Sequence, residues 1–127
     1  MMEGFTVSRP LSGACRYDLV AELNGRFIKI QVKSLKLDSA YDQEKLPYKV
    51  FVLEAYSYDP VKKTKKKYSR EEVDLIVGYN HDLKAFACVP LESFEGKYTA
   101  VVHETIGTRH EYFNNWSGLY EVYEELL

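Results

Sequence analysis

An acid, an amide and an amine occur within one short stretch of the chain, YDLVAELNGRFIKIQVKS at residues 17–34. Asp18 stands near its beginning, and Gln31 and Lys33 stand near its end. A carboxylate and an amide oxygen, helped by a backbone carbonyl, suit a hard cation such as Mg²⁺. A neighbouring ammonium could orient a water or neutralise a phosphate oxygen as charge develops on it. Brought together, these three side chains would suit phosphodiester cleavage.

Two strands and a tight turn are expected to position these residues. Apolar residues alternate through residues 17–23 and again through 26–34, as in half-buried strands. Asn24 and Gly25 stand between the two runs. Both residues accept positive φ angles, so they favour a two-residue hairpin turn of type I′.

The turn fixes which residues face each other across the hairpin. With Asn24 and Gly25 as the turn residues, Asp18 lies directly opposite Gln31 on the face away from the core, and Lys33 follows on that face. A register slip of one residue would separate the three side chains. The residue types and their spacing leave a second interpretation open. The three side chains could belong to an ordinary solvated hairpin face that has no catalytic role.

The remaining pattern predicts short strands, turns and one helix. Ser69 and Glu72 have the spacing of a capping box. The helix begins at about Trp116 and ends the chain. We expect an extended segment at 5–7, a loop or helical turn at 36–46, strands at 50–56, 73–79, 84–89 and 98–104, and helical turns at 69–72 and 90–94.

A basic segment at residues 59–67 is expected to be a loop. It carries five lysines, namely Lys62, Lys63, Lys65, Lys66 and Lys67. These lysines could contact nucleic-acid phosphates, and the alternative is a solvated loop without a partner. Nearby tyrosines such as Tyr56 and Tyr58 could stack on bases, although half-buried strand positions would also explain them.

Composition predicts one soluble domain spanning residues 1–127. Net charge is −2, yet residues 1–67 carry 13 Lys/Arg against 8 Asp/Glu, and residues 68–127 carry 4 against 11. A polyanion would therefore meet the first half of the chain. The sequence has no apolar run long enough for a membrane span and no signal-peptide core, so we expect no membrane partner and a cytoplasmic location. Cys15 and Cys88 have no metal-binding spacing.

The hairpin also resembles a known nuclease signature. Asp18, twelve intervening residues and then Gln31-Val32-Lys33 resembles the PD-(D/E)XK motif in the variant in which glutamine replaces the second acidic residue. The longer stretch SRPLSGACRYDLVAELNGRFIKIQVKS is similar to PD-(D/E)XK endonucleases related to group I intron homing enzymes, and EEVDLIVGYNHDLKAFACVP is similar to the second hairpin of that group. The resemblance covers about residues 4–90. It implies an α/β (α+β) fold of the restriction-endonuclease type, with a mixed central β-sheet and a C-terminal helix.

The resemblance implies a role for each of the three polar residues. Asp18 would be a metal ligand, Gln31 would occupy the second acidic position as a further ligand, and Lys33 would be the catalytic lysine. The implied activity is Mg²⁺-dependent hydrolysis of double-stranded DNA, with Mn²⁺ able to substitute. Two alternatives remain: a catalytically impaired protein of this fold that binds nucleic acid or a protein without cleaving it, and a purely structural subunit.

One departure from the family concerns the N-terminus. Family members normally begin with a helix whose glutamate completes the site, placed before the segment that matches residues 4–7. We expect that helix to be missing here, so either Glu3 supplies the third acidic group, another chain supplies it, or the site is incomplete. A site built mainly on Asp18 should bind Mg²⁺ weakly. An uncovered sheet face would also favour a homodimer or a higher homo-oligomer.

Overall fold

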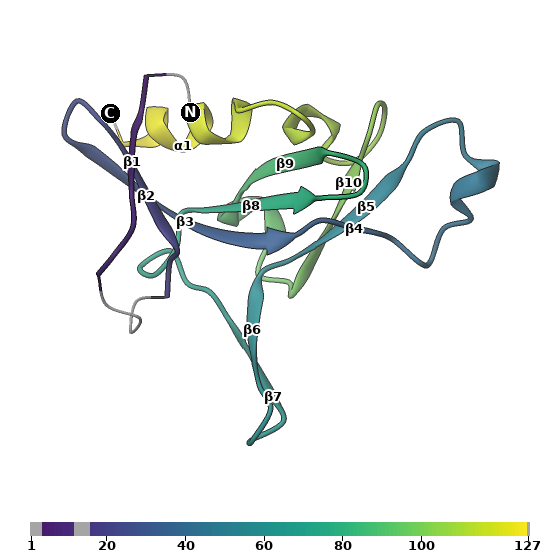
Figure 1. The fold of residues 1–127 in the computed structure, drawn as a ribbon, viewed down its shortest axis with the longest axis horizontal. Coiled ribbons are helices and arrows are strands. Elements are labelled where there is room, and N and C mark those ends of the chain that lie inside the picture. The colour runs from purple at the N-terminus through teal and green to yellow at the C-terminus, as the bar shows by residue number, and fades with distance from the viewer. Residues whose placement is uncertain (1–3, 12–15, 127) are drawn as a thin grey trace.

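The computed structural model describes residues 4–11 and 16–126 (Figure 1). The predictions made for Glu3 and Cys15 lie outside these residues.

A five-stranded mixed sheet organises the chain. Its strands lie in the order β1-β2-β3-β8-β9. β3 and β8 are parallel, and the other neighbours are antiparallel, so the predicted mixed central sheet is confirmed. The strand bounds are Thr6–Ser8 for β1, Leu19–Leu23 for β2, Arg26–Ser34 for β3, Leu75–Asn80 for β8 and Ala85–Pro90 for β9.

A second sheet covers one face of the first. It is antiparallel, with the order β10-β5-β4. Side chains from the two sheets form one core, in which Leu35, Phe51, Leu53, Ile76 and Val89 are almost fully buried. The strand bounds are Lys36–Leu37 for β4, Val50–Glu54 for β5 and Thr99–His103 for β10.

The opposite face of the first sheet packs against helix α1, Ser117–Glu125. Figure 1 shows this helix lying alongside the sheet. Ile28 and Ile30 of β3 meet Leu119 and Val122 of the helix in a second core. Gly118 allows the close approach, because a Cβ there would lie 1.9 Å from the carbonyl oxygen of Cys88.

No helix among the described residues is long and apolar enough to cross a membrane.

The acidic end of α1 is neutralised within the chain. Acidic residues in a last helical turn oppose the helix dipole. Arg70 forms an ion pair with Glu125 at 3.4 Å, and Nε of Arg26 donates to the carbonyl of Leu126 at 3.3 Å. The sequence alone suggests fraying or a basic partner at this end, and both arginines of the same chain supply the positive charge instead.

A separate two-stranded hairpin leaves the body of the molecule (Figure 1). Its strands are β6, Tyr56–Asp59, and β7, Thr64–Lys67, which pair with each other. We call residues 56–67 the basic ribbon. The prediction of a loop at 59–67 is therefore wrong for its second half. Lysine is a poor strand former, and the ribbon forms because β7 pairs residue by residue with the tyrosine-containing β6.

Several other boundaries differ from the sequence prediction. The expected strand at 50–56 is divided, because β5 ends at Glu54, Ala55 is buried and the chain then turns into the ribbon. The segment at 36–46 contains β4 and a 3₁₀ turn, η1, at Gln43–Lys45. Further 3₁₀ turns lie at Leu91–Phe94 (η2) and His110–Tyr112 (η3).

Candidate active site

The β2–β3 hairpin has the register that the Asn-Gly turn predicts. Asn24 and Gly25 have φ angles of 52° and 78°. Leu19 pairs with Ile30, and the Asp18 N–H donates to the Ile30 carbonyl at 2.8 Å. This pairing places Asp18 opposite Gln31 at the open end of the hairpin.

Asp18 and Gln31 are in direct contact. The Gln31 Nε2 donates to Asp18 Oδ2 at 2.7 Å, and the backbone N–H of Val32 donates to the same oxygen at 3.0 Å. Asp18 is exposed and Gln31 is half-buried. Two donors therefore hold an accessible carboxylate in one position, which is a suitable starting geometry for a metal ligand.

Lys33 lies one pleat further along the same face but points elsewhere. Its Nζ donates to the carbonyl of Tyr56 at 2.8 Å and lies 5.3 Å from the centre of the Tyr68 ring. Lys33 and Asp18 form no ion pair. The structure thus brings Asp18 and Gln31 together and anchors Lys33 beside them, at the root of the basic ribbon.

Arg16 is a further residue at this place, and the sequence analysis did not identify it. Its guanidinium donates to Glu72 at 3.1 Å, to Ser57 Oγ at 3.1 Å and to the carbonyl of Lys66 at 3.4 Å. It also lies 4.5 Å from the centre of the Tyr68 ring. The one sequence signal was its position two residues before Asp18, which in an extended chain places both side chains on one face.

Comparison with known proteins identifies the family of this chain. A model of the PD-(D/E)XK endonuclease family matches residues 1–118. The chain belongs to this family. A search of curated protein sequences found no match.

One solved structure similar to this member of the PD-(D/E)XK family is a bacterial homing endonuclease, I-Ssp6803I. The two share 21% sequence identity, and the match has a TM-score of 0.64. It covers 97% of this chain and 82% of the other. The restriction-endonuclease-like fold implied by the sequence resemblance is therefore confirmed.

PD-(D/E)XK nucleases generally use divalent metal ions, so the oxygen donors near Asp18 are relevant. Among the residues that the structure describes, no group of three or more His, Cys, Asp or Glu could hold a metal ion. The available donors are the Asp18 carboxylate, the amide oxygen of Gln31 and backbone carbonyls. Mg²⁺ commonly takes one or two carboxylates together with substrate phosphates and waters, so this donor set fits an ion that protein and substrate hold jointly.

The Gln31 amide would have to turn to act as a ligand. Its nitrogen now faces Asp18, whereas a cation requires the oxygen. Rotation about the terminal torsion exchanges the two atoms without moving the backbone. Glu3, the predicted third acidic group, lies outside the described residues.

Glu72 balances the basic residues around the site. It forms ion pairs with Arg16 at 3.1 Å and with Lys66 at 3.9 Å. Burial raises the pKa of its carboxyl, but the Ser69 N–H bond and the two cations outweigh this effect, so the pKa is lowered overall. Glu72 therefore stays ionised at neutral pH and fixes the base of the ribbon. Its bond to Ser69 also confirms the expected capping contact.

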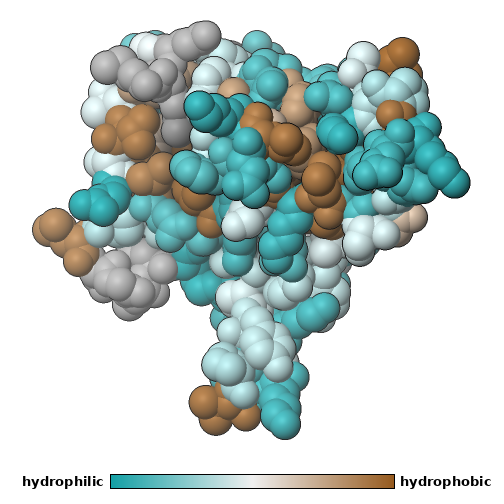
Figure 2. Space-filling model, turned by 45° about the vertical axis from the view of Figure 1, so that its right-hand side comes forward, coloured by the Kyte–Doolittle hydropathy of each residue, from teal (hydrophilic) through white to brown (hydrophobic). Residues whose placement is uncertain are grey.

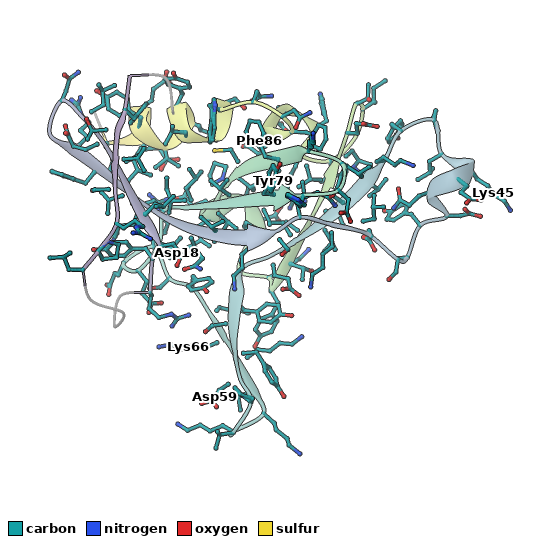
Figure 3. The ribbon with its side chains drawn as sticks, in the orientation of Figure 1. Asp18, Lys45, Asp59, Lys66, Tyr79 and Phe86 are labelled. Atoms are coloured by element: carbon teal, nitrogen blue, oxygen red, sulfur yellow. The ribbon has the colours of Figure 1, made fainter. Side chains whose placement is uncertain are left out.

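The predicted nucleic-acid-binding lysines all lie on the basic ribbon. Lys62 and Lys63 occupy its turn, and Lys65, Lys66 and Lys67 occupy β7. All five are exposed. Figure 3 shows Lys66 projecting from the ribbon toward the side of the molecule on which Asp18 lies. Arg16, Lys66 and ribbon residues line an open hollow of about 350 Å³ there.

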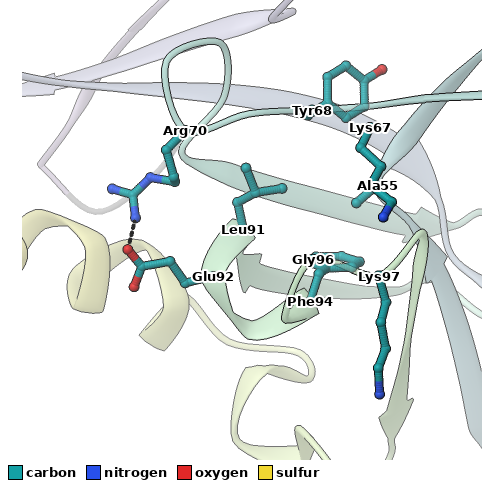
Figure 4. Close-up of a pocket in the computed structure, with 9 residues that line it drawn as sticks. All are labelled: Ala55, Lys67, Tyr68, Arg70, Leu91, Glu92, Phe94, Gly96 and Lys97. Atoms are coloured by element: carbon teal, nitrogen blue, oxygen red, sulfur yellow. Dashed lines mark hydrogen bonds and ion pairs between the residues drawn. The ribbon is translucent and has the colours of Figure 1, made fainter.

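A smaller cavity lies near Tyr68 and is shown in Figure 4. Its volume is about 220 Å³. Arg70 and Glu92 form a 2.6 Å ion pair at one end, and Lys67 and Lys97 lie toward the other. Because Arg70 also pairs with Asp74 and Glu125, its charge is compensated within the fold.

Cys88 has a structural role in this arrangement. It is buried beneath α1, and this burial raises the pKa of its thiol to about 12. A neutral, enclosed thiol is a poor nucleophile and a poor metal ligand.

Proposed function

We propose that this chain is a Mg²⁺-dependent DNA endonuclease that hydrolyses phosphodiester bonds, with Asp18, Gln31 and Lys33 at the reacting centre. The observation that carries the proposal is the 2.7 Å contact between Asp18 and Gln31, with Lys33 on the same face of the same strand. Membership of the PD-(D/E)XK endonuclease family supports the reaction class.

The metal would bind at Asp18 and at the turned amide of Gln31. When bound, a divalent cation supplies Lewis-acid stabilisation of the negative charge that develops on the phosphate. Mg²⁺ is the ion we propose, with Mn²⁺ able to substitute. Because this site offers one carboxylate among the described residues, we expect weak binding of the ion in the absence of DNA.

Lys33 would bind the scissile phosphate. An ammonium has three donors, and the Tyr56 carbonyl occupies one of them. The remaining donors can hold a phosphate oxygen while the Tyr56 contact keeps the amine in place. Contact with the Tyr68 ring limits its movement further.

The lysines of the basic ribbon would contribute affinity for DNA. Each phosphate that a lysine neutralises releases counterions, which makes binding depend on salt. The solved structure similar to this chain is described as a bacterial homing endonuclease, which supports DNA as the substrate class.

A second candidate function is DNA binding without cleavage. The observation that favours it is the donor set, because three acidic ligands do not meet among the described residues. The amide nitrogen of Gln31 also already donates a hydrogen bond to the Asp18 carboxylate.

We also propose that the protein acts as a homodimer. Each chain has one candidate centre, whereas cleavage of both strands of a duplex requires two, and most homo-oligomers use two-fold symmetry. Helix α1 packs on one face of the five-stranded sheet and the second sheet on the other, but among the described residues the core of the second sheet includes no side chain of β1 or β2. Phe27 is 61% exposed, and Tyr79 is 45% exposed. Figure 2 shows hydrophobic side chains gathered in the middle of one face of the body.

Light scattering at micromolar concentration tests whether the protein is a homodimer, and a monomer would contradict the proposal.

Two substitutions test the reacting centre. We expect Asp18→Asn and Lys33→Met each to lower the rate of Mg²⁺-dependent duplex cleavage by roughly 10²-fold or more, because each removes charge stabilisation from the transition state. Lys36→Met serves as the control, since Lys36 follows on the same chain segment and its side chain is 60% exposed. Cleavage that survives Asp18→Asn would overturn the proposed centre. Salt-dependent duplex binding without any cleavage by the unchanged protein would select the second candidate.

A further inference from the structure

The basic ribbon concentrates positive charge on a narrow projection. Residues 56–67 contain five lysines and one acidic residue, Asp59. The two strands form a sheet of their own, and Figure 1 shows them extending away from the body. An element with this charge and shape can reach a polyanion before the rest of the surface does.

A second projection of the same chain lacks this charge. Residues 38–49 also extend from the body in Figure 1, and their lysines, Lys45 and Lys49, stand among three acidic residues. Lys45 pairs with Asp42 at 3.7 Å. Both segments project from the body, so projection does not distinguish the ribbon. Its excess of five lysines over one acidic residue does.

The tip of the ribbon has a defined shape. Asp59 Oδ1 accepts hydrogen bonds from the backbone N–H groups of Val61 and Lys62, at 2.9 and 3.2 Å. The one carboxylate of the ribbon is thus used to hold the turn. Val61 is 89% exposed. Figure 2 shows the corresponding surface, a largely hydrophilic projection with a hydrophobic group at its end.

The two faces of the ribbon differ. Tyr56 pairs with Lys67, and Tyr58 pairs with Lys65, so these four side chains share one face. The Nζ of Lys65 lies 4.8 Å from the centre of the Tyr56 ring. The opposite face carries Lys66, whose side chain is 72% exposed. Lysines on both faces can meet phosphates on both sides of a groove.

The root of the ribbon is attached to the candidate active site. Lys33 donates to the carbonyl of Tyr56, and Arg16 donates to Ser57 and to the carbonyl of Lys66. The position of the ribbon is therefore coupled to the position of Lys33. DNA that is bound by the ribbon would be held at a fixed distance from the reacting centre.

We propose that the basic ribbon enters the major groove of duplex DNA and that Val61 and Lys62 at its tip read base edges. The inference rests on the proposed function for its substrate class. A major groove about 12 Å wide and 8.5 Å deep admits a two-stranded ribbon, and four-residue strands reach about 13 Å. Lysine can donate to guanine O6 and N7, and an apolar side chain can contact the thymine methyl group. The deep, narrow major groove of duplex RNA would exclude the ribbon.

Methylation interference tests this placement without requiring cleavage. Duplexes bound by the full-length protein in EDTA are selected from a randomised DNA library and treated with dimethyl sulfate, which marks guanine N7 in the major groove and adenine N3 in the minor groove. We expect N7 methylation within a short run of base pairs to block binding. Interference confined to adenine N3, or absence of selected duplexes, would overturn the inference.

Variants at the tip separate base reading from general affinity. We expect Val61→Gly with Lys62→Ala to remove the N7 interference and to relax preference at the affected positions by roughly tenfold. Lys65→Gln should instead weaken binding to all duplexes and lower the salt slope by about 0.9. Lys45→Ala, at the other projection, is the matched control and should change neither. An unchanged N7 pattern in the tip variant would contradict base reading by these residues.

A duplex RNA of matching sequence provides a further arm. We expect it to bind at least roughly tenfold more weakly than the DNA at the same salt concentration, since the ribbon cannot enter its major groove. Equal affinity would overturn the inference. These measurements are independent of catalysis, so loss of cleavage alone would count against the proposed reacting centre and leave the ribbon's role standing.

Discussion

The two hairpins of this chain, β2–β3 and β6–β7, are built on opposite principles. Ala21, Ile28 and Ile30 in the first hairpin are fully buried against the helix side of the sheet. The basic ribbon has no such buried face, and every residue of β7 is exposed. The first hairpin is held by apolar packing, and the second is held at its root by polar contacts from Arg16 and Lys33.

This difference separates two tasks. A hairpin with one buried face has only one acceptable register, because a slip by one residue would expose its apolar side chains. Such a hairpin can fix Asp18 against Gln31 to within hydrogen-bonding distance. A ribbon whose root contacts Tyr98, Arg16 and Glu72 and whose second strand is exposed can instead present charge to a large partner. The candidate chemistry lies on the first, and the proposed recognition surface lies on the second.

The largest contrast concerns global stability. We expect Ile30→Ala to lower the free energy of unfolding by about 2–5 kcal/mol, because it removes buried apolar volume and leaves a cavity. Val61→Ala, at the tip of the ribbon, should change it by less than about 0.5 kcal/mol. Urea denaturation followed by circular dichroism measures both. Similar losses for the two variants would show that the ribbon contributes to the core.

The attachment of the ribbon is expected to have an intermediate effect. Arg16→Gln removes charge-assisted hydrogen bonds to Glu72 and Ser57, so we expect a loss of about 1–2 kcal/mol of stability. Limited proteolysis should then cut the ribbon faster while the body stays resistant. Arg9→Gln is the control, because Arg9 is exposed. Unchanged proteolysis of the ribbon in Arg16→Gln would show that other contacts, those of Lys33 and Tyr98, hold the root.

The sequence predicts the first hairpin much better than the second. The Asn24-Gly25 turn and the buried residues together determine the register, so the contact between Asp18 and Gln31 follows from local chemistry. The ribbon lacks an apolar alternation, and its lysines indicate a loop. Neither of its two segments is predicted to be a strand by itself, and the strands form only because the segments pair with each other. Arg16 was missed for a related reason. Its partners lie 41 to 56 residues away in the chain, and no local spacing reports such contacts.

Acid should loosen the ribbon before it affects the core. The pKa of Glu72 is lowered in the folded protein. Its contacts with Arg16 and Lys66 therefore stabilise the fold at pH values above the ordinary glutamate pKa. This stabilisation is lost as the pH falls through the lowered pKa. We therefore expect the stability difference between the unchanged protein and Glu72→Gln to shrink as pH falls below the ordinary glutamate pKa of about 4.3 and through the lowered value. Amide hydrogen exchange within residues 56–67 should accelerate over the same range. A difference that is constant with pH would show that Glu72 acts through packing and not through its charge.

The turns of the two hairpins provide the smallest and most local test. Gly25 has a φ angle of 78°, where an added Cβ is strained, so Gly25→Ala should cost about 1 kcal/mol. Lys63 in the ribbon turn has a φ angle of 55° although it carries a side chain. Lys63→Gly should stabilise the folded protein by relieving that strain and destabilise it by giving the unfolded chain more conformational freedom. We expect the two effects to cancel to within about 0.5 kcal/mol.

Thermal unfolding of both turn variants gives the comparison. A clear loss for Gly25→Ala beside a negligible change for Lys63→Gly would show that the register of the first hairpin depends on its turn, whereas the ribbon depends on its root. Gly96→Ala is a useful reference, since Gly96 has a similar φ angle of 75° outside both hairpins. If Gly25→Ala proved no worse than Gly96→Ala and also preserved cleavage, then the buried strands alone would be sufficient to hold Asp18 against Gln31.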